Sequence, residues 1–169
     1  MSELRTNRIV PRDGLPSGSS GGIIQMKQTV KTDTFSKNSS SWADITGMSV
    51  SITPTRADSK VFVMVDIKIG TEHGDSDFHI KLVRGSPDVY VGDTEGSRTS
   101  SSMGGPSYSM PSNTSDGQYY LKQVSLNYLD SPSTTSSTTY KLQIRNYGGR
   151  TNFVNRTGND TDSQVYPRT

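Results

Sequence analysis

The chain has 169 residues with 18 basic and 16 acidic side chains, a net charge of +2, and no cysteine. This near-balance lacks the clustered basic stripe typical of nucleic-acid readers, so we expect no nucleic acid among its partners. Without cysteine there are no disulfides, thiolate metal sites or cysteine nucleophiles. No apolar run approaches the length needed to span a bilayer, so we expect no membrane insertion.

The apolar content is low for a folded domain of this length. Hydrophobic residues make up 29% of the chain, against about 45–50% in typical domains, although that figure also counts glycine. Serine and threonine fill much of the difference, which predicts a thin core of about one sandwich layer. We therefore expect stability to be shared with copies of the same chain or with another partner.

Residues 1–22 differ in composition from the rest of the chain. Three arginines are spaced through the segment, two prolines interrupt it, and it ends in a Gly/Ser run. Such a segment forms neither helix nor interior strand. It is either a disordered terminus or an extended arm that docks on another subunit. The residues that would dock are Leu4, Arg5, Arg8, Ile9, Val10 and Arg12.

From Ile23 onward, apolar residues alternate with polar ones at the period of a strand. The alternation covers residues 23–30, 48–52, 60–69, 78–82, 89–91, 119–128, 138–147, 153–154 and 165–166, with turn-rich stretches between. Eight or nine short strands without a helical period predict an all-β fold. We expect an antiparallel β-sandwich, jelly-roll-like, over residues 23–169, preceded by the extended N-terminal arm.

Residues 92–118 form a long segment without a convincing period. Structureless segments of this length are uncommon in compact domains and are often functional. The segment is either a surface loop without a partner or an adaptable contact surface, in which tyrosine lies among serine, glycine and asparagine.

The sequence contains no recognisable catalytic constellation. Glu72, His73, Asp75 and Asp77 could be drawn as an oxygen-rich metal site, but their spacing is not that of a calcium loop, and a solvated turn is favoured. The run Asn-Asp-Thr-Asp at residues 159–162 could also be drawn as a metal site, and again a solvated turn is favoured. No nucleophile elbow or phosphate-binding glycine loop is present. We therefore predict no catalytic residues, no metal and no cofactor, and the protein is expected not to be an enzyme.

Two phrases, DITGMSVSITP at residues 44–54 and LDSPSTTS at residues 129–136, carry a resemblance that extends over most of the chain. The chain resembles a family of bacteriophage virion structural proteins of the tail-fibre type, found in phages of marine and cyanobacterial hosts. The resemblance implies a virion protein made in the host cytoplasm, a homotrimer, and docking to other virion proteins through residues 1–22. Similar proteins carry one more strand after the point where this chain stops. Either that strand is missing from this sequence, or a neighbouring subunit supplies the pairing.

Three functions follow from these expectations. The first is a trimeric tail or head fibre that contacts a host surface glycan, with Arg98, Tyr108, Tyr119 and Tyr120 as candidate contacts because tyrosine offers a flat apolar face and a hydroxyl. The second is a capsid decoration or cement protein whose arm clamps capsid subunits. The third is a glycan-degrading tail enzyme, whose carboxylate pair would be set by distance in the fold rather than by spacing in the sequence. It ranks last because 16 acidic residues make chance pairs common.

Overall fold

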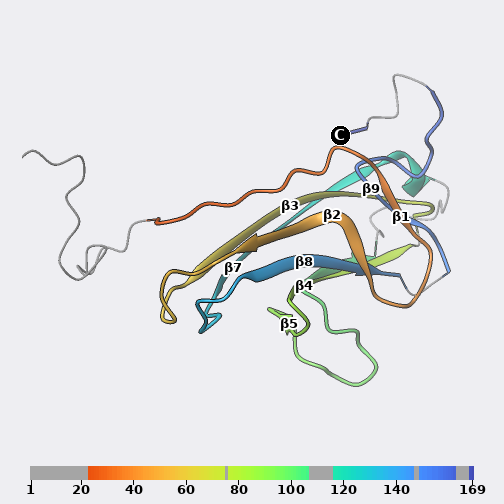
Figure 1. The fold of residues 1–169 in the computed structure, drawn as a ribbon. Helices are drawn as coiled ribbons and strands as arrows, with labels where there is room; N and C mark the ends of the chain where they lie inside the picture. Colours follow the sequence, from red (N-terminus) through yellow and green to blue (C-terminus); the bar gives the residue numbers. More distant parts are fainter. Residues whose placement is uncertain (1–22, 75, 107–115, 147–148, 163–167) are drawn as a thin grey trace, which may run out of the picture.

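The computed structural model describes residues 23–74, 76–106, 116–146, 149–162 and 168–169, which form two antiparallel sheets packed face to face (Figure 1). This arrangement confirms the predicted all-β sandwich. The elements are β1 (Phe35–Lys37), β2 (Ala43–Ile52), β3 (Val61–Thr71), β4 (Asp77–Arg84), β5 (Asp88–Val89), β6 (Met103–Pro106), the 3₁₀ helix η1 (Asp116–Tyr119), β7 (Leu121–Asp130), β8 (Thr138–Arg145) and β9 (Asn152–Val154).

The two sheets use strands from all parts of the chain. Sheet A has the order β1-β9-β3-β7, and sheet B has the order β2-β8-β4-β5, with β6 also paired to β4. The longest ladder joins β3 to β7, from Val61 opposite Asp130 to Gly70 opposite Leu121. Strands β2 and β3 are consecutive in sequence but lie in different sheets, so the turn between them connects the two layers.

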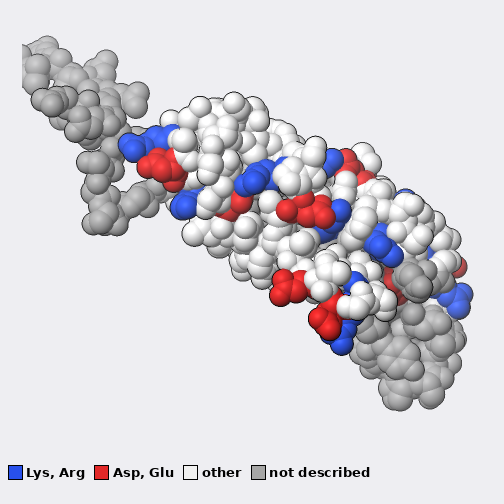
Figure 2. Space-filling model, turned by 90° about the horizontal axis from the view of Figure 1, so that it is seen from below, with Lys and Arg blue, Asp and Glu red and all other residues white. Residues whose placement is uncertain are grey.

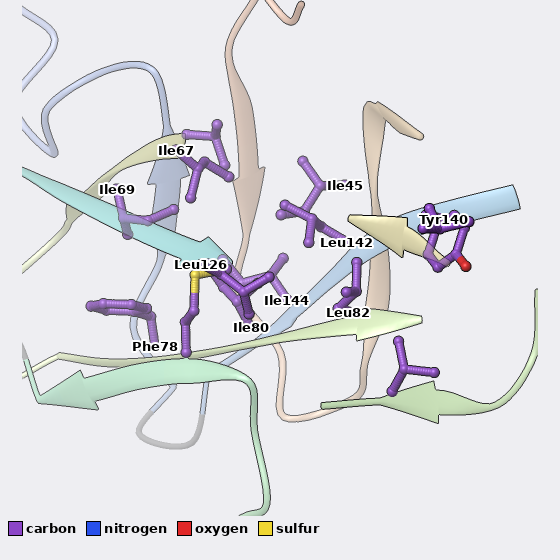
Figure 3. Packing of buried hydrophobic residues seen from close by; sticks show 14 residues of the cluster. Ile45, Ile67, Ile69, Phe78, Ile80, Leu82, Leu126, Tyr140, Leu142 and Ile144 are labelled. Carbon is purple, nitrogen blue, oxygen red and sulfur yellow. The ribbon is translucent and has the colours of Figure 1, made fainter. Parts of the chain in front are cut away.

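Inward-facing residues from both sheets make one core (Figure 3). Ile80 and Ile144 are 0% exposed and lie opposite each other on β4 and β8. Ile67 and Ile69 of β3 and Leu126 of β7 complete the layer from the facing sheet. The alternation seen in the sequence therefore reflects one buried and one exposed face on each strand.

The structure differs from the sequence expectations in three places. Residues 23–30, predicted as a strand, lie outside both sheets because no strand pairs with them among the described residues. The stretch 92–118 contains β6 and η1, which are too short to show a period. A short strand, β1, lies within the polar stretch 34–41. The strand predicted at residues 165–166 lies outside the described residues.

Candidate functional site

The residues singled out from the sequence fall into three groups. Leu4, Arg5, Arg8, Ile9, Val10, Arg12 and Tyr108 lie outside the described residues. Arg98 is exposed in the connection between β5 and β6. Tyr119 ends η1 and Tyr120 follows it, with exposed fractions of 39% and 54%. Arg98 and the two tyrosines thus belong to different connections, and both connections are exposed.

The most unusual feature of the surface is an extended segment, residues 23–34, that runs along β2 and β3 without joining either sheet (Figure 1). Its apolar side chains point into solvent: Ile23 is 83% exposed, Met26 76% and Val30 69%. A strand-like stretch that buries none of its apolar residues gains nothing from its own fold. These residues therefore form a row of exposed apolar side chains on the surface.

The C-terminal half of this segment is held in place by side-chain hydrogen bonds. The Asn155 amide donates to the carbonyl oxygens of Lys31, at 2.8 Å, and Asp33, at 3.1 Å. The Thr29 hydroxyl donates to the Gly47 carbonyl at 3.2 Å. Gly47 has a φ of +83° where the β2 register shifts, and the Lys31 side chain packs against it, only 2% exposed. The segment is therefore anchored at residues 29–33.

The edge of sheet A beside this segment is open. The Asn155 backbone N–H donates to the Lys68 carbonyl at 3.0 Å, and β9 pairs with β3 only at residues 69–71. Because backbone groups alternate along a strand, Phe62, Met64 and Asp66 direct their N–H and C=O groups to the same edge. In the described parts of the chain, no strand pairs with this stretch.

The core is incompletely covered along the same line. Inward-facing Val63 and Val65 of β3, and Met48 and Val50 of β2, are only partly buried, whereas Ile67 is 3% exposed. A groove of about 160 Å³ lies between β2 and β3, with residues 27–29 of the extended segment forming part of its wall, and it reaches the core residues Leu82, Tyr140 and Leu142. A second groove, of about 470 Å³, lies between residues 28–31 and the outer side of β3 and β7. We call this open line between β2 and β3 the seam.

The outer face of sheet A adds further apolar surface next to the seam. Phe62 and Leu129 lie directly opposite each other on β3 and β7, and each is 58% exposed. Met64, one step along the same face, is 71% exposed. Apolar cross-strand pairs on the face of a sheet usually pack against another apolar surface.

Charges around the sandwich are paired locally rather than gathered into one field. On the face shown in Figure 2, basic and acidic residues are interspersed. Lys141 and Gln143 of β8 hydrogen-bond the Asp44 carboxylate of the neighbouring β2, and these hydrogen bonds, from Gln143 first, lower the pKa of Asp44. Asp66, on the outer face of β3, accepts from the Gln123 amide at 2.6 Å. Such a surface favours specific docking over long-range attraction of a polyanion.

A buried polar cluster ties three strands together at one end of the sandwich. Arg84 of β4 donates to both carboxylate oxygens of Asp130 on β7, at 2.9 and 2.8 Å. The Tyr140 hydroxyl of β8 donates to the same carboxylate. Asp130 is 3% exposed and Tyr140 is also 3% exposed. Each member has a partner, so the cluster serves as a cross-sheet connection rather than a reactive site.

The phenol of Tyr140 gives this cluster a measurable pH signature. Burial, and then the hydrogen bond to Asp130, raise the pKa of Tyr140 well above its usual value near 10. As the pH rises through 10, the unfolded chain loses the phenolic proton first, so this contribution to stability falls, with a slope of up to about 1.4 kcal/mol per pH unit. The stability advantage of the wild type over Tyr140→Phe should therefore shrink above pH 10. Urea unfolding of both proteins between pH 8 and 11.5 measures this difference in the free energy of unfolding. A difference that stays constant over this range would contradict the raised pKa of Tyr140.

Neither a metal-binding group nor a membrane-spanning helix is found among the described residues. Within the described ranges, no group of three or more His, Cys, Asp or Glu side chains could hold a metal ion. Asp77, one of the carboxylates considered from the sequence, lies at the start of β4, where the His79 ring contacts its carboxylate at 3.0 Å. None of the helical structure described here is long and apolar enough to cross a membrane.

Comparisons with known proteins do not assign a family. No protein-family model matches the chain, and no curated protein matches it.

Sequence reasoning did not find the seam, although its components were visible. The alternation over residues 60–69 predicts that Phe62 and Met64 lie on the face opposite the core, but it does not indicate that they remain 58% and 71% exposed. The signal that could have found it is the apolar character of both faces of residues 61–65, because a strand with one wet face normally alternates apolar with polar residues.

Proposed function

We propose that this protein is a structural subunit of a bacteriophage virion, a homotrimeric tail or head fibre protein that is anchored through residues 1–22. The observation that carries the proposal is the extended segment at residues 23–34, which is held at one end and exposes apolar side chains along the seam. Such a subunit has no interior of its own for these residues, and neighbouring copies would cover them. The phage resemblance supplies the kind of assembly.

The anchoring part of the proposal follows from the order of the chain. Residues 1–22 lead directly into a segment that already lies on the outside of the sandwich, so an arm at this position can reach another virion protein without disturbing the fold. The exposed Arg98, Tyr119 and Tyr120 lie on connections and remain the candidates for contact with a host surface glycan.

The anchor is tested by deleting residues 2–20. We expect the truncated protein to sediment as a trimer like the full chain but to be missing from assembled particles, because the deletion leaves every described strand intact. Incorporation is measured by immunoblotting purified particles from a complementation strain. The full-length Arg98→Ala variant, which keeps the arm, is the control and should be incorporated. Truncated protein found in particles at the wild-type level would refute the anchor.

The same particles distinguish a fibre from a decoration protein. Gel densitometry against the major capsid protein gives the copy number, and a fibre is present in few copies. A copy number that matches the capsid subunits would replace the fibre with the capsid decoration or cement function, in which the arm clamps adjacent capsid subunits.

A further inference from the structure

The extended segment lies against the seam of its own copy. Residues 27–29 form part of the wall of the groove that reaches the core, and residues 28–31 line the second groove, beside β3 and β7. The half-buried Val63 and Val65 of β3 line the first groove, so the segment covers part of the core where the two sheets meet. Moving the segment away would expose these valines further to water, which costs free energy.

The segment contacts the sandwich with its polar side. The Lys31 side chain is 2% exposed and packs against Gly47, whereas Met26 is 76% and Val30 69% exposed. On the polar side, the Thr29 hydroxyl also donates to the Gly47 carbonyl, at 3.2 Å. Burial of the segment's own apolar side chains therefore contributes little to its attachment. A segment held by a few hydrogen bonds belongs to the least stable parts of a fold and can detach locally.

Asn155 makes the strongest attachment. Its side-chain amide donates two hydrogen bonds, to the carbonyl oxygens of Lys31 at 2.8 Å and Asp33 at 3.1 Å. Its own backbone N–H donates to the Lys68 carbonyl at 3.0 Å, which fixes the residue to β3. Asn155 is 9% exposed and has a φ of +62°, a conformation that asparagine and aspartate adopt more readily than most residues. One side chain on the sandwich thus holds two consecutive turns of the segment's backbone.

We infer that residues 23–33 form a releasable cover over the seam, with the Asn155 amide as its latch. Residues 1–22 continue directly into this cover, so a pull on the arm reaches the latch before it reaches β1 or either sheet. Release uncovers the groove at Val63 and Val65 and leaves both sheets paired, because none of their ladders includes residues 23–33. The cover is a property of the single subunit and does not depend on whether residues 1–22 dock on another virion protein.

Trypsin measures the release, because cleavage after Lys31 requires its buried side chain to leave the sandwich. Asn155→Asp removes the amide donor and turns a carboxylate toward two carbonyl oxygens, while it keeps a residue that tolerates positive φ. The control Asn127→Asp makes the same chemical change on β7, at the other wall of the second groove. Mass spectrometry of the full-length proteins follows cleavage after Lys31 and, as a report on unfolding of the sandwich, after Lys81 of β4.

We expect Asn155→Asp to be cleaved after Lys31 about tenfold faster than the wild type and Asn127→Asp, because cleavage follows the population of the open state. The rate after Lys81 should not change. Thr29→Val, which removes the hydrogen bond to Gly47, should raise the rate after Lys31 about threefold.

Equal rates of cleavage after Lys31 in the wild type and all three variants would overturn the latch. A parallel rise at Lys31 and Lys81 would also overturn it, because the segment would then leave only when the whole sandwich unfolds. If Asn155→Asp does not fold, the result for Thr29→Val decides whether the cover is releasable. The deletion of residues 2–20 leaves the cover in place, so the anchor and the cover are tested separately.

Discussion

Replacing Asp130 with alanine is expected to lower the free energy of unfolding by about 3 kcal/mol, the lower end of the usual cost of removing one partner from a buried charge pair, because the Asp130 side chain is 5% exposed but the Arg84 side chain is 28% exposed. Arg84 Nη1 would lose both carboxylate oxygens to which it donates, at 2.9 and 2.8 Å, and the buried Tyr140 hydroxyl would lose its acceptor. The three residues come from β4, β7 and β8, so the change loosens the connection between both sheets. Urea denaturation followed by circular dichroism measures the loss.

The matched control is Asp58→Ala, which breaks the Arg56–Asp58 pair on the surface. Both side chains of that pair are more than half exposed, and exposed pairs contribute little to stability. We expect no measurable change in the free energy of unfolding of Asp58→Ala. If Asp130→Ala were as mild as the control, the cluster would not connect the sheets.

Replacing Gly70 with alanine should cost about 3 kcal/mol, the upper end of the usual range for overpacking. Gly70 lies near the end of β3, where the chain at residues 156–158 crosses it closely. A Cβ atom at Gly70 would lie 2.2 Å from the Arg156 carbonyl oxygen and 3.0 Å from the Thr157 Cα, so backbone would have to move. Glycine in a strand interior often marks such an approach.

Gly105→Ala provides the comparison, since Gly105 lies in β6 and a Cβ atom there would meet nothing within 4 Å. We expect a change within about 0.5 kcal/mol for this control. Thermal unfolding of the two variants side by side measures the difference. Equal unfolding midpoints for Gly70→Ala and Gly105→Ala would mean that residues 156–158 can move away from the added Cβ atom without a loss of stability.

The close approach at Gly70 also limits how far β9 extends along β3. Beyond Ile69 and Val154 the chain leaves the ladder at Asn155, whose φ is +62°, and residues 156–158 cross close to Gly70, so β9 pairs with only three residues of β3. This packing therefore sets where β9 ends along β3.

Local alternation was enough to predict most strands. Val61, Val63, Val65, Ile67 and Ile69 form a row of period two, and the structure places them on the inner face of β3. The same holds for Tyr140, Leu142 and Ile144 of β8. A pleated strand requires this period whatever its partner, so sequence suffices.

Partners could not be predicted in the same way. Residues 23–30 alternate as convincingly as β8 but pair with no strand in the described chain. The Arg84, Asp130 and Tyr140 cluster was equally hidden, because 46 positions separate Arg84 from Asp130. The two-residue alternation of apolar side chains shows which face of a strand is buried, but it does not show which other strand packs or pairs with that strand.

The sequence alone determined that this protein is all-β, that its core is thin, and that its chain contains no thiol chemistry, because those properties depend on composition and local period. Tertiary structure decided which strand edges remain open, which apolar residues stay in solvent, and where a buried carboxylate finds its arginine and tyrosine. The physical reason is that burial and strand pairing depend on contacts between residues far apart in the sequence. The local alternation of apolar and polar residues does not determine which of these residues come into contact.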